Sequence, residues 1–446
     1  MPTSSFHQKG LIWPALGFMK RIISHRSSML TTGAVFMIAL LLEGCGGGGG
    51  TAGGPAPVID FSKKRAGLGA TDPAGQPIDP LDIVPIHVDR ATAEPSTANS
   101  NDFDFQEVDS PCMVDDPGRP LAPLPATTND RYMLFYEATD GFLENSIGLI
   151  TSNDYDFDEI ILQRLQVLQA AGLPSVEFSG TLEDAISVTD PTVVVDKSVP
   201  FGSPTRYRMW VEGVYGLNLS AFLTCTSGDG ESWTVPELCT GFELGPQFGT
   251  VSQVVDPDVV LVQEIGETYR MVFEVIRTDQ SAVLGMATSL DGVNWTVTDG
   301  TFIETNAGPV FSGGPGAFDD GAVRSPGLGI ERDPITDAIL EWHLFYEGQP
   351  SDFLSNNDSL IGYSNSVNGF SWSGYAVPVI TPTSDILQPS AFDTDDVKHP
   401  YIFVRTPDPI TDPLPDLNKL ILYYSGDPEF SAGGTDVNRI GVATAE

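Results

Sequence analysis

The feature that most constrains the fold is a repeated pattern of valine, two variable residues and proline. It occurs at Val108–Pro111, Val188–Pro191, Val254–Pro257, Val323–Pro326 and Val397–Pro400. Proline has no backbone N–H, so within a sheet it favours the start of a strand, an edge strand or a bulge. Repetition of one unit along a chain predicts stacked or radial copies of one small structure.

Three further landmarks follow these prolines. An aromatic strand begins at Tyr132, Tyr207, Tyr269, Trp342 and Leu420. A third strand, marked by an aliphatic residue and glycine, occurs at Ile147-Gly148, Leu284-Gly285, Ile361-Gly362 and Ile440-Gly441, with Phe222-Leu223 as the weaker copy. A hairpin-type turn then runs over Ser227–Trp233, Ser289–Trp295 and Ser366–Trp372. The sequence therefore predicts an all-β chain, a five-bladed β-propeller with four-stranded antiparallel blades around a central axis.

Two segments need separate treatment. The long insertion Asp158–Ala185 places Ile161, Leu165 and Leu168 at helical spacing, which predicts a short helix. The sequence ends at Glu446, directly after the third strand of the last unit. We expect the segment before Val108 to supply the missing fourth strand, because such an exchange closes the ring and removes an open edge.

The start of the chain reads as a targeting segment. Lys20, Arg21 and Arg26 precede the apolar run Met29–Leu42, which is too short for a comfortable membrane span. Leu42–Cys45 resembles the lipobox of bacterial lipoproteins, which implies a lipid on Cys45. We expect an exported protein, lipid-anchored to the bacterial cell envelope at the outer membrane or cell surface, with ordinary secretion as the alternative. The predicted division is a signal peptide over 1–44, a flexible Gly/Pro-rich tether over 45–101 and the propeller over 102–446.

The chain is strongly acidic, with a net charge of −38. Such a surface repels phosphate backbones and argues against a nucleic-acid partner. The charge is explained either by solubility in a salty medium or by divalent cations bound to some of the carboxylates. We expect a monomer that contacts a membrane only through its lipid anchor.

The remaining cysteines divide into a pair and a single residue. Cys225 and Cys239 flank a hairpin-like segment, which in an exported protein favours a local disulfide. Cys112 lies in an apolar strand and is expected to be a buried free thiol.

Polar residues gather directly before the five prolines. They are Asp109, Ser110, Asp190, Asp256, Arg324, Ser325, Lys398 and His399. The first strand of each propeller blade lines the axis, so these side chains are predicted to converge at one end of it. Their restriction to one end of buried strands favours a functional site. The alternative is that Asp before Pro caps a local turn.

Glutamates that end the aromatic strands are predicted to be structural. They are Glu137, Glu212, Glu274 and Glu347. A catalytic residue is needed once, whereas a contact between blades is needed in every blade. By the same reasoning the Ser-x-Asp-Gly-x-x-Trp turns are predicted to fasten hairpins, and most of the tryptophans to lie in the core.

Phe-Asp-x-x-x-Val-x-x-Pro, the aromatic strand and the Ser-x-Asp-Gly-x-x-Trp turn together resemble the five-bladed β-propeller glycosidases. That group includes the arabinanases and β-xylosidases of glycoside hydrolase family 43, the invertases and the levansucrases. The resemblance extends over about Phe103 to Glu446. It implies an axial sugar pocket with Asp109 as base, Asp190 as the orienting and tuning residue, and Asp256 as acid. The family acid is usually Glu, and Asp258 is a second candidate for that role.

Arg324 and Lys398 are candidates for binding sugar hydroxyls or an anionic sugar. His399 resembles a histidine that supports a bound cation in several family members, and its alternative is a hydrogen-bonded strand residue. The predicted function is to cleave or bind an oligosaccharide or polysaccharide in the axial pocket. No cofactor is required for this chemistry, and a calcium ion at the axis agrees with the resemblance. The alternatives are a non-catalytic carbohydrate-binding propeller and a partner-binding surface propeller.

Overall fold

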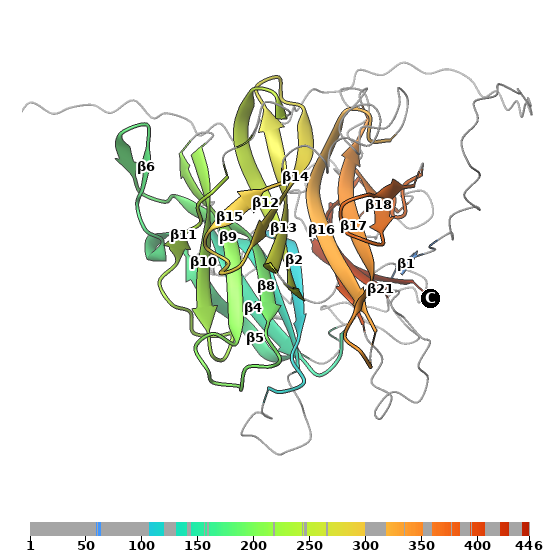
Figure 1. Ribbon diagram of the computed structural model, residues 1–446, viewed down its shortest axis with the longest axis horizontal. Helices are drawn as coiled ribbons and strands as arrows, with labels where there is room; N and C mark the ends of the chain where they lie inside the picture. Colours follow the sequence, from blue (N-terminus) through green and yellow to red (C-terminus); the bar gives the residue numbers. More distant parts are fainter. Residues whose placement is uncertain are drawn as a thin grey trace, which may run out of the picture. The chain divides into compact units, whose positions relative to one another are not determined.

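Each Val-x-x-Pro segment lies in the innermost strand of its own four-stranded antiparallel sheet in the computed structural model (Figure 1). Blade 1 contains β2 (Glu107–Asp115), β3 (Tyr132–Thr139), β4 (Asn145–Ser152) and β5 (Ile160–Gln169). Blade 2 contains β8 (Ser187–Val195), β9 (Tyr207–Gly216), β10 (Leu219–Ser227) and β11 (Glu237–Leu238). Blade 3 contains β12 (Val251–Glu264), β13 (Glu267–Arg277), β14 (Ala282–Ser289) and β15 (Trp295–Val297). Blade 4 contains β16 (Ala322–Arg332), β17 (Ile339–Gln349), β18 (Leu360–Ser366) and β19 (Ser373–Gly374). Blade 5 contains β20 (Asp396–Val404), β21 (Leu420–Asp427), β22 (Arg439–Ala445) and β1 (Phe61–Lys63).

The structure describes part of the chain. The described residues are 59, 61–63, 107–119, 131–140, 144–155, 157, 160–216, 219–242, 244, 248–264, 266–298, 318–333, 335–350, 359–375, 377–383, 393, 395–405, 420–427 and 439–445. The chain divides into two units, Met1–Pro55 and Ala56–Glu446, and all of the described residues belong to the second. The predicted signal peptide and Cys45 lie outside them.

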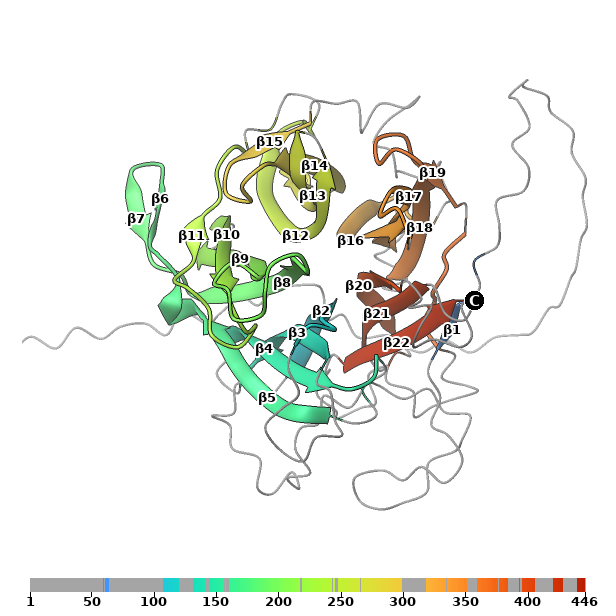
Figure 2. The ribbon, with the colours of Figure 1, turned by 60° about the horizontal axis from the view of Figure 1, so that its bottom comes forward.

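The five sheets form a closed ring. The innermost strands β2, β8, β12, β16 and β20 each contact the next in chain order, and β20 contacts β2. Figure 2 shows these five strands around a common centre, with the later strands of each blade farther out. The prediction of a five-bladed propeller is confirmed.

The ring is completed by a strand from the start of the second unit. β1 pairs antiparallel with β22, so that Phe61 lies opposite Ala445 and Lys63 opposite Ala443. This is the strand exchange that was predicted for the last blade. Part of the predicted tether is thus a strand of blade 5, which therefore has no open edge at β22.

The repeated glycine of the third strand has a packing reason. Gly148, Gly285 and Gly362 each lie opposite an aromatic residue of the second strand. A Cβ atom at Gly148 would come within 2.4 Å of the Tyr136 ring, and the same distance applies at Gly285 and Gly362 for their aromatic partners. An aromatic ring therefore lies across each of these glycines, and no larger residue leaves room for it.

The turn motif fastens hairpins, as predicted. In blade 3, Asp291 Oδ1 accepts hydrogen bonds from the backbone N–H groups of Val293 (2.9 Å) and Asn294 (2.8 Å). The Gly292 carbonyl accepts from Nε1 of Trp210, in the preceding blade, at 2.8 Å. Trp210 is fully buried. The motif closes one hairpin and also joins two blades.

The predicted helix within Asp158–Ala185 is wrong. The segment instead forms β5, the 3₁₀ turn η1 (Ala170–Gly172) and a small hairpin of β6 (Val176–Phe178) and β7 (Thr181–Glu183). β5 pairs with β4 and is the outermost strand of blade 1. Leucines three residues apart lie on opposite faces of a regular strand, but β5 shifts its register between Gln166 and Leu168. Leu165 and Leu168 therefore both pack against the same core cluster, and β5 pairs with the open edge of β4.

The predicted disulfide is also wrong, because Cys225 and Cys239 are separate buried thiols. In the β10–β11 register Leu223 lies opposite Leu238, and the Cys239 N–H donates to the Phe222 carbonyl. Cys225 is three residues beyond Phe222, roughly 10 Å along the strand and on the opposite face. That separation exceeds the Cα–Cα distance a disulfide spans. Cys112 is a buried free thiol, as predicted.

No helix of the length and apolar character needed to cross a bilayer occurs in the part of the chain that the structure describes.

Candidate functional site

The residue directly before each repeated proline has an unusual backbone conformation. Its φ angle is positive in all five blades: Ser110 45°, Asp190 50°, Asp256 50°, Ser325 41° and His399 45°. Left-handed geometry costs a non-glycine residue about 1–2 kcal/mol, and a following proline disfavours helical angles further. Each first strand also shifts its register at this point. Such strain persists only where the surrounding structure imposes it, and it often accompanies functional sites.

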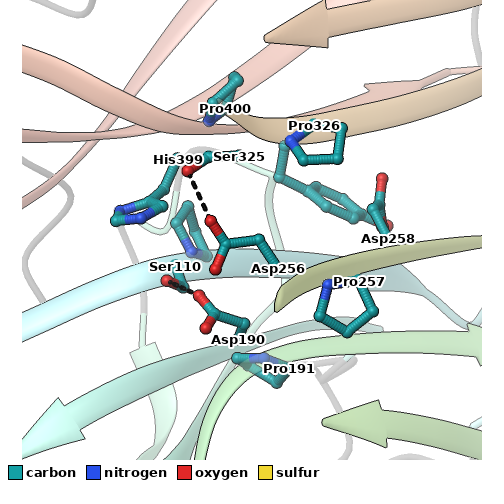
Figure 3. Close-up of a pocket in the computed structure, with 12 residues that line it drawn as sticks. Ser110, Asp190, Pro191, Asp256, Pro257, Asp258, Ser325, Pro326, His399 and Pro400 are labelled. Carbon is teal, nitrogen blue, oxygen red and sulfur yellow. Dashed lines mark hydrogen bonds between the residues drawn. The ribbon is translucent and has the colours of Figure 1, made fainter. Parts of the chain in front are cut away.

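The bulges direct these side chains to the axis. Figure 3 shows Ser110, Asp190, Asp256, Ser325 and His399 facing a common space, with the prolines beside them. The cavity that they line has a volume of about 40 Å³. This is room for water or a small ion, but not for a sugar ring within the cavity itself. A larger ligand would have to bind at its mouth.

Two carboxylates come together in this cavity, as predicted. Oxygen atoms of Asp190, Asp256 and Glu212 all lie within 4.8 Å of one another. The Ser110 hydroxyl donates to Asp190 at 2.7 Å, and the Ser325 hydroxyl donates to Asp256 at 2.9 Å. Burial, reinforced by the negative charge of Asp256, raises the pKa of Asp190 to about 7. A proton on Asp190 therefore relieves the repulsion between the two groups near neutral pH.

Asp109 does not line the cavity, and Ser110 takes the equivalent position in blade 1. Asp109 is buried beside His399, whose Nδ1 lies 2.6 Å from its Oδ1. Burial alone would raise the pKa of Asp109, but the charge and hydrogen bond of His399 outweigh it and hold that pKa well below its usual range. Burial likewise opposes the charged form of His399, yet Asp109 raises the pKa of the imidazole well above its usual range. The two residues form an ion pair between the last and first blades.

The predicted sugar-binding cations Arg324 and Lys398 do not line the cavity. The Arg324 guanidinium pairs with Glu274 at 2.8 Å. The Lys398 ammonium lies 3.9 Å from Asp427. Of the three predicted substrate-binding residues, His399 alone faces the axial space.

The repeated glutamates hold the strained peptides in place. Glu212 accepts a hydrogen bond from the backbone N–H of Asp256 (3.3 Å), and Glu274 accepts one from that of Ser325 (3.2 Å). In both cases the glutamate of one blade binds the pre-proline residue of the next. The prediction of a structural contact is confirmed for these two residues. Glu212 also lies beside the carboxylate pair, which its repetition in the sequence did not suggest.

Asp258, two residues after Asp256, is buried and forms hydrogen bonds across three blades. Asp258 accepts from the Thr192 hydroxyl at 2.8 Å and from the Leu328 N–H at 2.5 Å, so it joins blades 2, 3 and 4. Burial raises the pKa of Asp258 to about 7. A Cβ atom at Gly327 would lie 2.2 Å from the Pro400 carbonyl oxygen. Asp258, the second candidate for the acid, thus lies at the floor of the cavity in a structural hydrogen-bond network.

The fit of a calcium ion differs between the candidate ligands. Carboxylates are the oxygen donors that calcium prefers, and Asp190, Glu212 and Asp256 are close enough together to hold a divalent cation. Calcium prefers oxygen ligands to imidazole nitrogen, and the Nδ1 of His399 already lies 2.6 Å from Asp109 Oδ1. The carboxylates therefore fit the predicted calcium ion by donor type, whereas His399 is placed to pair with Asp109 beside them.

No protein-family model matches the sequence, and no curated protein matches it. Among solved structures, a complex of BT0996 with RGII is similar with a TM-score of 0.50 and 11% identity, over 78% of this protein and 90% of that one. A glycosyl hydrolase from Bacteroides ovatus has a TM-score of 0.48 and 17% identity, over 76% and 84% of the two proteins. The α-L-arabinofuranosidase PaAbf62A from Podospora anserina, in complex with cellotriose, has a TM-score of 0.45 and 13% identity, over 78% and 93%. What is shared at these identities is the fold.

Proposed function

We propose that the protein is a glycoside hydrolase-like propeller that acts on a glycan at the mouth of its axial cavity. The observation that carries the proposal is the pair of carboxyl groups, Asp190 and Asp256, with oxygen atoms within 4.8 Å of each other. Glycosidases need one neutral and one charged carboxyl group at the same site. The pKa of Asp190, raised to about 7, supports its role as the neutral acid.

The short separation favours a two-step mechanism. Retaining glycosidases hold their carboxyl groups about 5–5.5 Å apart, whereas inverting enzymes leave about 6.5–9.5 Å for a water molecule. In this proposal the Asp256 carboxylate attacks the anomeric carbon while Asp190 donates its proton to the departing glycosidic oxygen. Asp190 then accepts a proton from the water that cleaves the glycosyl–Asp256 ester. The Asp109–His399 ion pair positions the ring beside the acid but transfers no proton.

The test is release of sugar from aryl glycosides and from plant and algal polysaccharides. Asp190→Asn and Asp256→Asn are each expected to lower the release at least 100-fold, because general acid catalysis alone contributes about 10²–10⁴. Asp337→Asn is a matched control, since Asp337 is largely exposed and lies outside the cavity. Equal release by the wild type and both site variants would exclude this catalytic assignment.

A non-catalytic glycan-binding role is the second candidate. It is favoured by the cavity volume of about 40 Å³ and by the hydroxyl groups that already hydrogen-bond to both carboxylates. This role predicts saturable binding of an oligosaccharide without product, weakened by Asp256→Asn. Calorimetry on the polysaccharide panel separates it from the hydrolase.

Action outside the cytoplasm is part of this proposal. The protein would reach its glycan while anchored through a lipid on Cys45, or after secretion. Cys45→Ala is expected to move the protein from the membrane fraction to the soluble fraction. Unchanged fractionation of this variant would argue against the anchor.

A further inference from the structure

A second cluster of metal-ligand residues lies on blade 4, apart from the residues that line the axial cavity. It contains Glu331 on β16 and Glu341 and His343 on β17. One potential ligand atom from each residue lies within 4.8 Å of the other two. β16 carries Ser325 to the axial cavity near its start and Glu331 near its end, so the two sites lie toward opposite ends of this strand.

The strand register brings two like charges together. Glu331 and Glu341 are direct cross-strand partners in the β16–β17 ladder. Carboxylates in this position destabilise a sheet unless a positive charge compensates them. His343 is two residues beyond Glu341 and therefore faces the same side of the blade.

His343 carries a buried nitrogen atom that is directed at the two glutamates. His343 is 3% exposed, and its Nε2 has no hydrogen-bond partner among the described residues. This Nε2 lies 3.8 Å from Oε2 of Glu331, so it faces the glutamates. A buried polar atom without a partner is costly, and here it is directed into a cluster of potential ligands.

The groups behind the cluster are those that orient metal ligands. Nδ1 of His343 lies 2.8 Å from the Tyr363 hydroxyl. When Nδ1–H donates to that oxygen, Nε2 keeps its lone pair on the side of the glutamates. The Asn365 amide donates to Glu341 and fixes that carboxylate. Hydrogen bonds of both kinds are regular features around metal-bound histidine and carboxylate.

We propose that Glu331, Glu341 and His343 bind a first-row divalent metal ion of the zinc type. Imidazole with carboxylates suits such ions, whereas calcium and magnesium prefer oxygen ligands alone. The ion offsets the repulsion between the paired glutamates and ties β16 to β17. Glu331 is 24% exposed, which gives the ion access and leaves room for a water ligand.

To test this, the full chain is stripped of metal and titrated with Zn²⁺, and binding is measured by calorimetry. The wild type is expected to bind at this site, and His343→Gln and Glu341→Gln are each expected to weaken that binding at least 10-fold. The matched control is Glu264→Gln. Glu264 also faces a glutamate across a hairpin, but that partner, Glu267, is bonded to Arg270 at 2.6 and 2.7 Å. The control should bind Zn²⁺ as the wild type does.

Co²⁺ supplies a readout at the site itself. Its visible absorption bands should change when it binds to the wild type and should lose that change in His343→Gln. Asp256→Asn alters only the axial carboxylate cluster, so the Co²⁺ spectral change and the Zn²⁺ affinity that depend on His343 should persist in it. The proposal is overturned if the wild type binds no Zn²⁺, if the folded His343→Gln or Glu341→Gln variant keeps full affinity, or if Asp256→Asn abolishes binding instead. Circular dichroism identifies the folded variants, and Glu341→Gln carries the test if His343→Gln does not fold.

Discussion

His399 of the last blade donates a hydrogen bond to Asp109 of the first, with Nδ1 and Oδ1 2.6 Å apart. The pair joins β20 to β2, where the ring of inner strands closes. β1 completes the outer side of the same blade through its pairing with β22. The propeller is therefore closed by an ion pair near the axis and by strand exchange at the rim.

Removing the axial closure should destabilise the protein. His399→Gln removes the imidazolium that pairs with the buried Asp109, and loss of one member of a buried pair costs about 3–5 kcal/mol. Urea unfolding at pH 5.5 should show a loss of about 3 kcal/mol in the free energy of unfolding. A double-mutant cycle with Asp109→Asn isolates the interaction. Additive effects of the two substitutions would contradict the pairing.

The contribution of the Asp109–His399 pair to the stability of the fold depends on pH. The pKa of Asp109 is held below its ordinary value of 3.8, so its contribution is present above pH 3.8 and disappears as the pH falls through the folded-state value. The pKa of His399 is raised above 6.5, so its contribution is complete below pH 6.5 and declines as the pH rises toward the folded-state value. The difference between wild type and His399→Gln should therefore be largest between pH 3.8 and 6.5. An equal difference at pH 5.5 and pH 9 would contradict this assignment.

The fold could be predicted from the sequence because each landmark has a local physical cause. Gly148 must be glycine beneath the Tyr136 ring, and Asp291-Gly292 must form a tight turn. These requirements recur in several blades, so they are visible without any structure. β5 was missed because the spacing of Leu165 and Leu168 also fits a helix, and only the open edge of β4 distinguishes the two.

The strand exchange at β1 can be tested through Lys63. Lys63 donates to the buried carboxylate of Asp393, which also accepts from the Tyr424 hydroxyl at 2.9 Å. Lys63→Met should lower the free energy of unfolding by about 3 kcal/mol, because it leaves Asp393 buried without its cation. Lys197→Met is the control: Lys197 is 53% exposed and 3.6 Å from Asp115, and such pairs contribute about 0–1 kcal/mol. If Lys63→Met and Lys197→Met lower the free energy of unfolding in urea equally, β1 does not dock through Lys63.

The axial site could be predicted only in part. Asp190, Asp256 and His399 directly precede proline, and all three reach the cavity. Asp109 stands one position earlier, and the left-handed bulge turns Ser110 to the axis in its place. A positive φ is uncommon for a non-glycine residue, so the composition around Ser110 does not predict it. The blade 4 cluster was missed for a similar reason, since Glu331 and Glu341 meet only through the strand register.

The buried thiols of Cys225 and Cys239 give a prediction about reduction and labelling. Burial raises the pKa of Cys225 to about 12, and it does the same for Cys239, so neither is a thiolate at neutral pH. Dithiothreitol should therefore leave the melting temperature unchanged, and a thiol reagent should label these residues only after unfolding. Cys225→Ala and Cys239→Ala variants identify the labelled positions by mass spectrometry. A lower melting temperature under reducing conditions would point to a disulfide instead.

The carboxylate pair can be tested without any substrate. The pKa of Asp190 is about 7 because of burial and the charge of Asp256. In a ¹³C-aspartate NMR titration Asp190 should titrate near pH 7 in the wild type, and Asp256→Asn should move this transition to lower pH. Asp258 is an internal control, because burial alone raises its pKa to about 7 and Asp256 takes no part. The titration of Asp258 should be unchanged in Asp256→Asn. The signal that is missing from the spectrum of Asp190→Asn identifies Asp190.

The activity profile must follow the same titration if the proposed hydrolase is correct. Asp190 donates a proton, so turnover should fall about tenfold per pH unit above the pKa of Asp190 near 7, as the neutral acid is lost. The raised pKa also means that the charged form of Asp190 disfavours the folded state. Stability should therefore decline as the pH rises from 3.8 toward 7 on account of this group. In Asp190→Asn that decline should become smaller by the share of Asp190 while the activity is lost, and the share of Asp258 should remain. A variant that loses activity but keeps the full pH dependence of the wild type's stability would assign that dependence to other carboxyl groups, and Asp258 would then be the first to test.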